Sequence, residues 1–181
     1  MKLLLKYRIV LSGFMLGLLL SGLTAFPLTA ELNILYNWLA PRQAWFPALF
    51  EWISIVRTGL IETDAKYPFI AYGTDWLAFG HMMIAAAYIG PWRDPIRNRF
   101  ILEWGMFCCV AVIPVAFICG PIRGIPIGWT WLDCAFGIVG FPPLYLCWKW
   151  SKKMEAQTVT ATTGSSSQPR DAQPAPAFSE R

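Results

Sequence analysis

Two ionisable side chains lie inside long apolar stretches of this sequence. His81 is the only histidine of the chain, and Asp133 lies in a second apolar stretch nearer the C-terminus. A carboxylate near the centre of a bilayer costs about 2.5–3.5 kcal/mol on insertion scales, so such residues usually face protein and have a partner. His81 and Asp133 are therefore the candidate catalytic residues, either as a proton-handling pair or as a pair that anchors a ligand.

The expected depths of these two residues match. On the helices described below, each lies within about two turns of the extracytoplasmic end. We therefore expect a contact between His81 and Asp133, with Asp75 and Arg123 above it at the outer mouth. The resulting hypothesis is an outward-opening polar pocket whose ligand-binding residues are Asp75, His81, Arg123 and Asp133. A purely structural hydrogen bond between the second and fourth helices is the alternative.

The remaining chemistry-bearing residues predict neither a metal site nor a cofactor. Zinc needs three or four His, Cys, Asp or Glu ligands at fixed spacing, and a haem held by two histidines is excluded within a chain that has one. The sequence also has no Gly-x-Ser-x-Gly, no Walker loop and no glycine-rich dinucleotide fingerprint. The five cysteines are best explained as small apolar filling. A disulfide between Cys119 and Cys134 stays open.

The composition is that of a membrane protein. Hydrophobic residues make up 56% of the chain and charged residues 14%, against about a quarter charged in soluble domains. Four apolar runs cover residues 7–25, 75–92, 100–120 and 128–148. About 20 apolar residues cross a bilayer, and the second run reaches this length if it starts near Pro68 or Ile70. The sequence predicts an all-α integral membrane protein with a four-transmembrane-helix bundle.

Cations flank these runs unevenly, which predicts the orientation. The nine that we place on the cytoplasmic side are Lys2, Lys6, Arg8, Arg93, Arg97, Arg99, Lys149, Lys152 and Lys153. The four that we place outside are Arg42, Arg57, Lys66 and Arg123. The positive-inside rule then puts both termini in the cytoplasm of a multi-pass protein of the inner or plasma membrane. Because the cations flank the spans, the net charge of +4 gives no reason to expect a nucleic-acid partner.

Residues 1–25 are expected to form the first transmembrane helix, with a cleaved signal peptide as the alternative. Small residues recur every fourth position along it, at Gly13, Gly17, Ser21 and Ala25. A stripe of this kind lets another helix approach closely. Besides membrane lipids, a membrane-protein partner on this face is therefore a possible interaction.

The rest of the chain divides into three parts. Residues 26–74 are expected to form an extracytoplasmic amphipathic helical connection between the first and second spans. Within it, residues 45–61 are interpreted as lying on the membrane surface, with a re-entrant segment or a fifth span as rivals. Residues 75–150 hold the other three spans. Residues 151–181 are expected to be a disordered cytoplasmic tail because they are rich in Ser, Thr, Pro, Ala and Gln.

The second and third spans are each expected to stop at a Gly-Pro-x-Arg sequence. These stops begin at Gly90 and Gly120. Glycine accepts the left-handed conformation at a helix end, proline forbids continuation, and arginine faces the negative end of the helix dipole.

Two classes of function fit these features. The first is an accessory subunit of a membrane complex or a protein that binds a lipophilic ligand. The alternative is a membrane enzyme or transporter that handles a small lipophilic molecule through the pocket of His81 and Asp133.

Overall fold

The computed structural model describes residues 2–166, and within this range the chain is all-helical, without strands. The helices are α1 (Lys2–Thr24), α2 (Leu28–Leu39), α3 (Pro47–Lys66), α4 (Tyr72–Ala87), α5 (Ile89–Arg93), α6 (Arg99–Ile122) and α7 (Ile127–Ser166), with short 3-10 helices η1 (Ala40–Arg42) and η2 (Pro68–Ile70). The expectation of an all-α protein is confirmed for this part of the chain.

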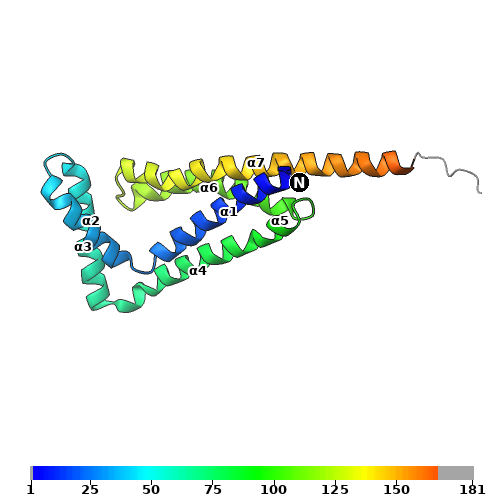
Figure 1. Ribbon diagram of the computed structural model, residues 1–181. Helices are drawn as coiled ribbons and strands as arrows, with labels where there is room; N and C mark the ends of the chain where they lie inside the picture. Colours follow the sequence, from blue (N-terminus) through cyan, green and yellow to red (C-terminus); the bar gives the residue numbers. More distant parts are fainter. Residues whose placement is uncertain (1, 167–181) are drawn as a thin grey trace, which may run out of the picture.

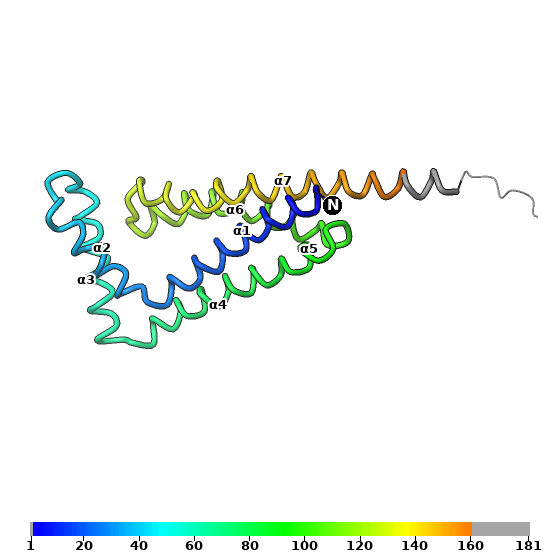
Figure 2. The backbone as a smooth tube through the Cα atoms, in the orientation of Figure 1, coloured from blue at the N-terminus to red at the C-terminus, as the bar shows by residue number. Residues whose placement is uncertain are grey.

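Two pairs of long helices form the body of the molecule (Figure 1). Helix α1 packs along α4, helix α6 packs along α7, and α1 also contacts α7. The two pairs meet near the N-terminus and α5, and they diverge toward the opposite end of the molecule (Figure 2). Helices α2 and α3 lie side by side across that opposite end.

The main core lies where the two pairs meet. Its fully buried members come from three helices, α1, α6 and α7, and from the connection between α4 and α5: Tyr7, Leu11, Tyr88, Leu102, Leu144 and Cys147. Polar groups at this end are also paired, since the Tyr7 hydroxyl donates to the Pro91 carbonyl at 3.0 Å. The Ser151 hydroxyl likewise donates to the Pro95 carbonyl at 2.7 Å. A buried polar group without a partner costs about 1–3 kcal/mol of stability, and each of these hydrogen bonds avoids that cost.

Glycines allow the helices of this core to approach one another. A Cβ on Gly105 of α6 would overlap the Tyr88 hydroxyl and crowd Leu144. A Cβ on Gly137 of α7 would overlap the backbone carbonyl oxygen of Cys109 on α6. Small residues at helix contacts are the usual way in which apolar helices come close.

A second, smaller cluster holds α2 against α3. Leu32 and Leu39 pack on Ile53, and all three are buried. The Arg57 guanidinium donates to Asn33 and also covers the ring of Tyr36. This unit reaches α7 through the rings of Trp52 and Trp129, whose centroids are 6.4 Å apart.

Among the described residues, three helices are long and apolar enough to cross a membrane by length and composition: α1, α6 and the Ile127–Thr160 part of α7. The second expected span is interrupted, because α4 ends at Ala87 and α5 begins at Ile89. Pro91 explains the break, since it has no N–H to donate to the Ala87 carbonyl four residues earlier. The Tyr88 N–H instead bonds the Ala85 carbonyl at 3.2 Å, which tightens the turn.

Two local expectations differ from the structure. Helix α7 continues to Ser166, so the first part of the expected disordered tail is helical. Lys152 to Gln157 are good helix formers, and extending an existing helix needs no new nucleus. The bond from Arg99 to Glu155 also fastens this extension to α6. Residues 167–181 lie outside the described part of the chain.

Helix α5 ends at Arg93 and α6 at Ile122, within the two expected Gly-Pro-x-Arg stops. The expected role of the glycines in these stops is wrong. Gly120 lies inside α6, where a Cβ would come 2.9 Å from the Thr130 hydroxyl oxygen, and Gly90 lies inside α5. The glycine with a positive φ in the described chain is Gly124, at 69°, just after α6. The close approach of Thr130, and not a left-handed backbone conformation, therefore explains why a glycine is found at position 120. Cys119 and Cys134 are both free.

Replacing Gly137 by Ala tests the close approach of α6 and α7. The added Cβ meets backbone, which cannot move aside as a flexible side chain can. We expect the Gly137→Ala variant to lose about 1–3 kcal/mol of stability, the usual cost of overpacking. Gly128→Ala on the same helix is the control, because its Cβ would meet nothing within 4 Å. Thermal unfolding of both purified variants in one detergent measures the difference, and equal unfolding temperatures would contradict the expectation.

Candidate functional site

An aromatic depression lies at the N-terminal end of α4. It has a volume of about 280 Å³, and its lining residues are Phe26, Tyr72, Asp75, Trp76, Phe79 and Met82. Phe26 comes from the turn between α1 and α2, and the others come from α4. The α4 members are spaced three or four residues apart, which places them along one side of the helix.

The rings of this depression form a row along α4. The centroids of Tyr72 and Trp76 are 5.9 Å apart, and those of Trp76 and Phe79 are 5.6 Å apart, both in edge-to-face geometry. The rings stay largely accessible, with Trp76 57% exposed. Edge-to-face contacts fix the ring orientations and leave ring faces free to receive a ligand.

Asp75 is the one charged group among the described residues that line the depression. Within the described part of the chain its side chain has neither a hydrogen-bond partner nor a salt bridge, and it is partly buried. It lies in the first turn of α4, where the helix dipole favours a negative charge. The depression therefore combines an ionisable acid, free to interact with a ligand, with a row of aromatic rings.

His81 is engaged with its own helix and with α1. Its Nδ1 atom lies 2.8 Å from the Leu77 carbonyl oxygen. Because a carbonyl only accepts, Nδ1 carries the proton in this contact. A Cβ added at Gly22 of α1 would come within 2.9 Å of the His81 Cβ, so α1 packs closely against this residue. His81 and Asp75 are six residues apart, about 120° around the helix, so they lie on different sides of α4.

Asp133 lies on α7, whereas His81 lies on α4. It is exposed, and no hydrogen bond or salt bridge of its side chain is formed within the described residues. Gly140, two turns further along the same side of α7, lies against Phe14 of α1. Asp133 is therefore on the side of α7 that faces α1 at Gly140.

His81 and Asp133 also lie at different distances along their helices from the core. Tyr88 and Leu144 meet at Gly105, which gives the two segments a common layer. His81 precedes Tyr88 by seven residues, or about 10 Å of helix, and Asp133 precedes Leu144 by eleven residues, or about 16 Å. Arg123 is exposed at the C-terminal end of α6. Within the described part of the chain, no hydrogen bond or salt bridge joins any two of the four expected ligand-binding residues.

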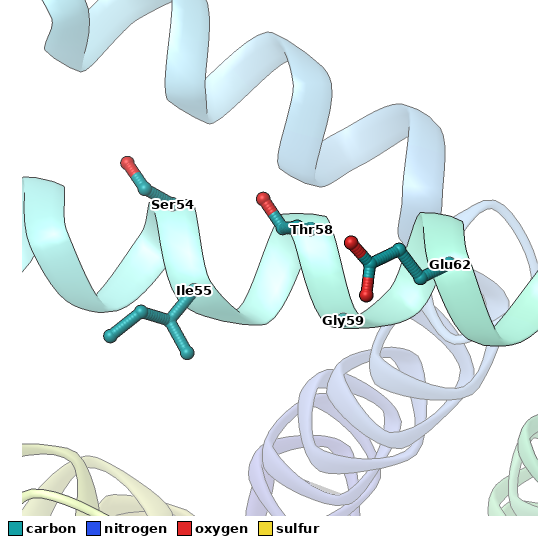
Figure 3. A pocket seen from close by; sticks show the side chains of 5 residues that line it. All are labelled: Ser54, Ile55, Thr58, Gly59 and Glu62. Atoms are coloured by element: carbon teal, nitrogen blue, oxygen red, sulfur yellow. The ribbon is translucent and has the colours of Figure 1, made fainter.

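A second depression, on α3, is larger but simpler. It measures about 430 Å³, and its lining residues are Ser54, Ile55, Thr58, Gly59 and Glu62. Figure 3 shows the Ser54 and Thr58 side chains on the same side of α3 and Ile55 on the other. The Ser54 hydroxyl is already bonded to the Phe50 carbonyl at 2.7 Å. All five residues come from one helix, so no second described element encloses a ligand here.

Within residues 2–166 no group of three or more His, Cys, Asp or Glu side chains is placed to hold a metal ion.

Comparison with known proteins does not identify the chain: no family model, no curated protein and no solved structure matches it. The function must therefore be inferred from the site itself.

Our sequence interpretation missed the aromatic depression as a unit. The spacing of Tyr72, Asp75, Trp76, Phe79 and Met82 already indicates one side of a helix, so the sequence carries part of this signal. The contribution of Phe26 has no such pattern, because it depends on how the turn after α1 lies against α4.

The separation of His81 and Asp133 predicts that they act independently on stability. In a double-mutant cycle of His81→Ala and Asp133→Ala, we expect the coupling energy to lie within about 0.5 kcal/mol of zero, as for residues without shared partners. Unfolding of the four proteins in a mixed-micelle titration provides the measurement. A coupling above about 1 kcal/mol would show that the two side chains meet.

Proposed function

We propose that this chain is a four-span integral membrane protein that binds a lipophilic ligand at the aromatic depression of α4. The spans are α1, the α4–α5 segment, α6 and α7. Large apolar side chains that remain exposed support insertion in a bilayer, among them Phe100, Phe107, Val115 and Ile118 of α6. A soluble monomer rarely exposes apolar patches of this extent.

The α4–α5 segment has the dimensions of the fourth span. It covers residues 72–93, which rise about 33 Å as a helix. Its packing along α1 and the burial of Tyr88 in the core favour a place beside the other spans. Tyr7 and Leu11 of α1 are also fully buried there. A cleaved signal peptide would take both from the core, so a retained first helix is favoured.

The charge distribution supports cytoplasmic termini. Arg8 of α1 covers the Trp92 ring of α5, with its guanidinium carbon 4.6 Å from the ring centroid. Lys152 of α7 covers Trp148 at 4.1 Å. Cations and tryptophans thus gather at the end where the helix pairs meet, as at a cytoplasmic interface. Helices α2 and α3 lie at the other end, where an extracytoplasmic amphipathic unit is expected.

Reporter fusions test this topology. Alkaline phosphatase, which is active only outside the cytoplasm, should be active when fused after Lys66 or Gly124 and inactive when fused after Asn98. Green fluorescent protein at the C-terminus should fluoresce, because it folds in the cytoplasm. An active phosphatase after Asn98 would overturn the arrangement of four spans.

The aromatic depression is the observation that supports ligand binding. It is apolar, formed by two chain segments and open at the surface of α4. Ligand pockets are typically lined by aromatic side chains with a small number of placed polar groups, and Asp75 is such a group here. A molecule dissolved in the outer leaflet can reach this surface without crossing the helix bundle.

An accessory subunit is the second candidate function. A Cβ added at Gly13 or Gly17 of α1 would meet no described atom within 4 Å, so this part of the small-residue stripe is open. Another membrane helix can approach closely along such a surface. The enzyme or transporter alternative gains less support, because its two proposed residues lie apart.

Photolabelling tests the binding of a lipophilic ligand. The probe is an uncharged long-chain alcohol that carries a diazirine, added to the full-length protein in phosphatidylcholine nanodiscs. We expect labelled peptides to contain Phe26 or residues 72–82, and Trp76→Ala to reduce this labelling at least about threefold through lost apolar contact.

Trp131→Ala is the matched control, because Trp131 is 55% exposed and lies outside the depression. It should leave labelling of residues 72–82 unchanged. Even labelling along every lipid-facing helix would contradict a ligand site. Stoichiometric protein partners in mild detergent, lost in Gly17→Leu, would instead support the accessory role.

A further inference from the structure

We propose that the ligand of the aromatic depression is a cationic amphiphile: an alkylammonium ion whose charged head lies between Asp75 and the aromatic rings. This inference rests on the proposed function and adds the charge of the ligand. It follows from the placement of one unpaired carboxylate among four rings, in a depression of about 280 Å³ within the described part of the chain.

The electrostatics of the lining favour a positive charge. Aromatic faces carry negative quadrupole density, and cations within about 6 Å of a ring centroid are attracted to it. Asp75 adds a full negative charge, and among the described residues no lysine or arginine lines the depression to neutralise it. The nearest basic residue in sequence, Lys66, lies over the ring of Tyr67, which is not part of the lining.

The chemistry of the lining changes along its length. Asp75 and Tyr72 are at the outer end of α4, and Met82 lies seven residues further inward than Asp75, about 10 Å along the helix. The inner part is lined by Phe79 and Met82, which offer apolar contact only. A ligand with a charged head and an alkyl chain of roughly this length matches both ends at once.

The same features discriminate against other amphiphiles. A fatty acid would bring a second carboxylate to Asp75, and like charges at close range repel. A zwitterionic phospholipid carries a phosphate beside its ammonium group, and the described lining offers no cation to receive it. An uncharged alcohol gains the apolar contacts but neither the ion pair nor the cation–π attraction. A single positive charge is therefore the best match.

The experiment uses tritiated decyltrimethylammonium below its micellar concentration. Full-length protein in phosphatidylcholine nanodiscs is titrated, and binding to empty nanodiscs is subtracted. We expect saturable binding at one site, displaced by unlabelled decyltrimethylammonium at least about tenfold better than by decanol or decylphosphocholine, since desolvated cation–π and ion-pair contacts exceed about 1.4 kcal/mol together.

Variants test which residues attract the ammonium group of the probe. Asp75→Asn should weaken binding about tenfold or more, Trp76→Leu should weaken it several-fold, and Asp75→Glu should keep most of the affinity. Glu62→Gln is the matched control, since it removes one negative charge from α3, outside the depression. It should bind like the unmodified protein. Thermal unfolding of each variant in the same nanodiscs checks that it is folded. If Asp75→Asn does not fold, the preference of the unmodified protein for decyltrimethylammonium over decanol tests the charge.

Three results would overturn the proposal, and they differ in whether the proposed lipophilic site also fails. If decanol competes as well as the ammonium probe and Asp75→Asn changes nothing, the charge assignment is wrong while the lipophilic site stands. If Asp75→Asn and Glu62→Gln weaken binding equally, the attraction belongs to the whole outer surface. If no probe binds saturably and Trp76→Leu has no effect, the proposed function fails as well.

Discussion

The close approach of three helices at Gly105 is the contact on which the rest of the structure depends. Tyr88 fills the space left by the missing side chain, and Leu144 of α7 reaches the same point from the other side. Tyr88 is also the residue at which the helix breaks between α4 and α5. The helix break that Pro91 causes therefore falls at Tyr88, whose ring fills the core beside Gly105. The same residue changes the direction of the chain and packs in the core.

This arrangement concentrates order at one end of the molecule. The buried cluster, the bonds to the Pro91 and Pro95 carbonyls and the contact of Arg99 with Glu155 all lie there. Toward the other end the helix pairs diverge, and α2 and α3 have a separate small core. A firmly joined end can hold the helices in register while the diverging ends present side chains for binding, which is the usual division between scaffold and site.

Composition and periodicity are sufficient for the coarse fold. Apolar runs predict helices, and the pairing of cations with helix ends predicts which ends belong together. The details that failed depend on packing. Helix α6 ends at Ile122, within the expected stop, but the position of Gly120 inside the helix is explained only by its close approach to Thr130. The helical extension to Ser166 is fastened by a bond between Arg99 and Glu155, which are 56 residues apart in sequence. Such contacts are set by tertiary structure and leave no local pattern.

The candidate site shows the same limit more sharply. His81 and Asp133 are conspicuous because an ionisable group in an apolar run is costly, yet His81 bonds its own helix and Asp133 lies on another. Asp75 was expected only at the outer mouth of their pocket. An interfacial belt accounts for aromatic residues near a membrane surface, but it does not require three of them to lie in a row beside an unpaired carboxylate. That juxtaposition, and not the rarity of the histidine, is the reason for which we propose a chemical preference at this surface.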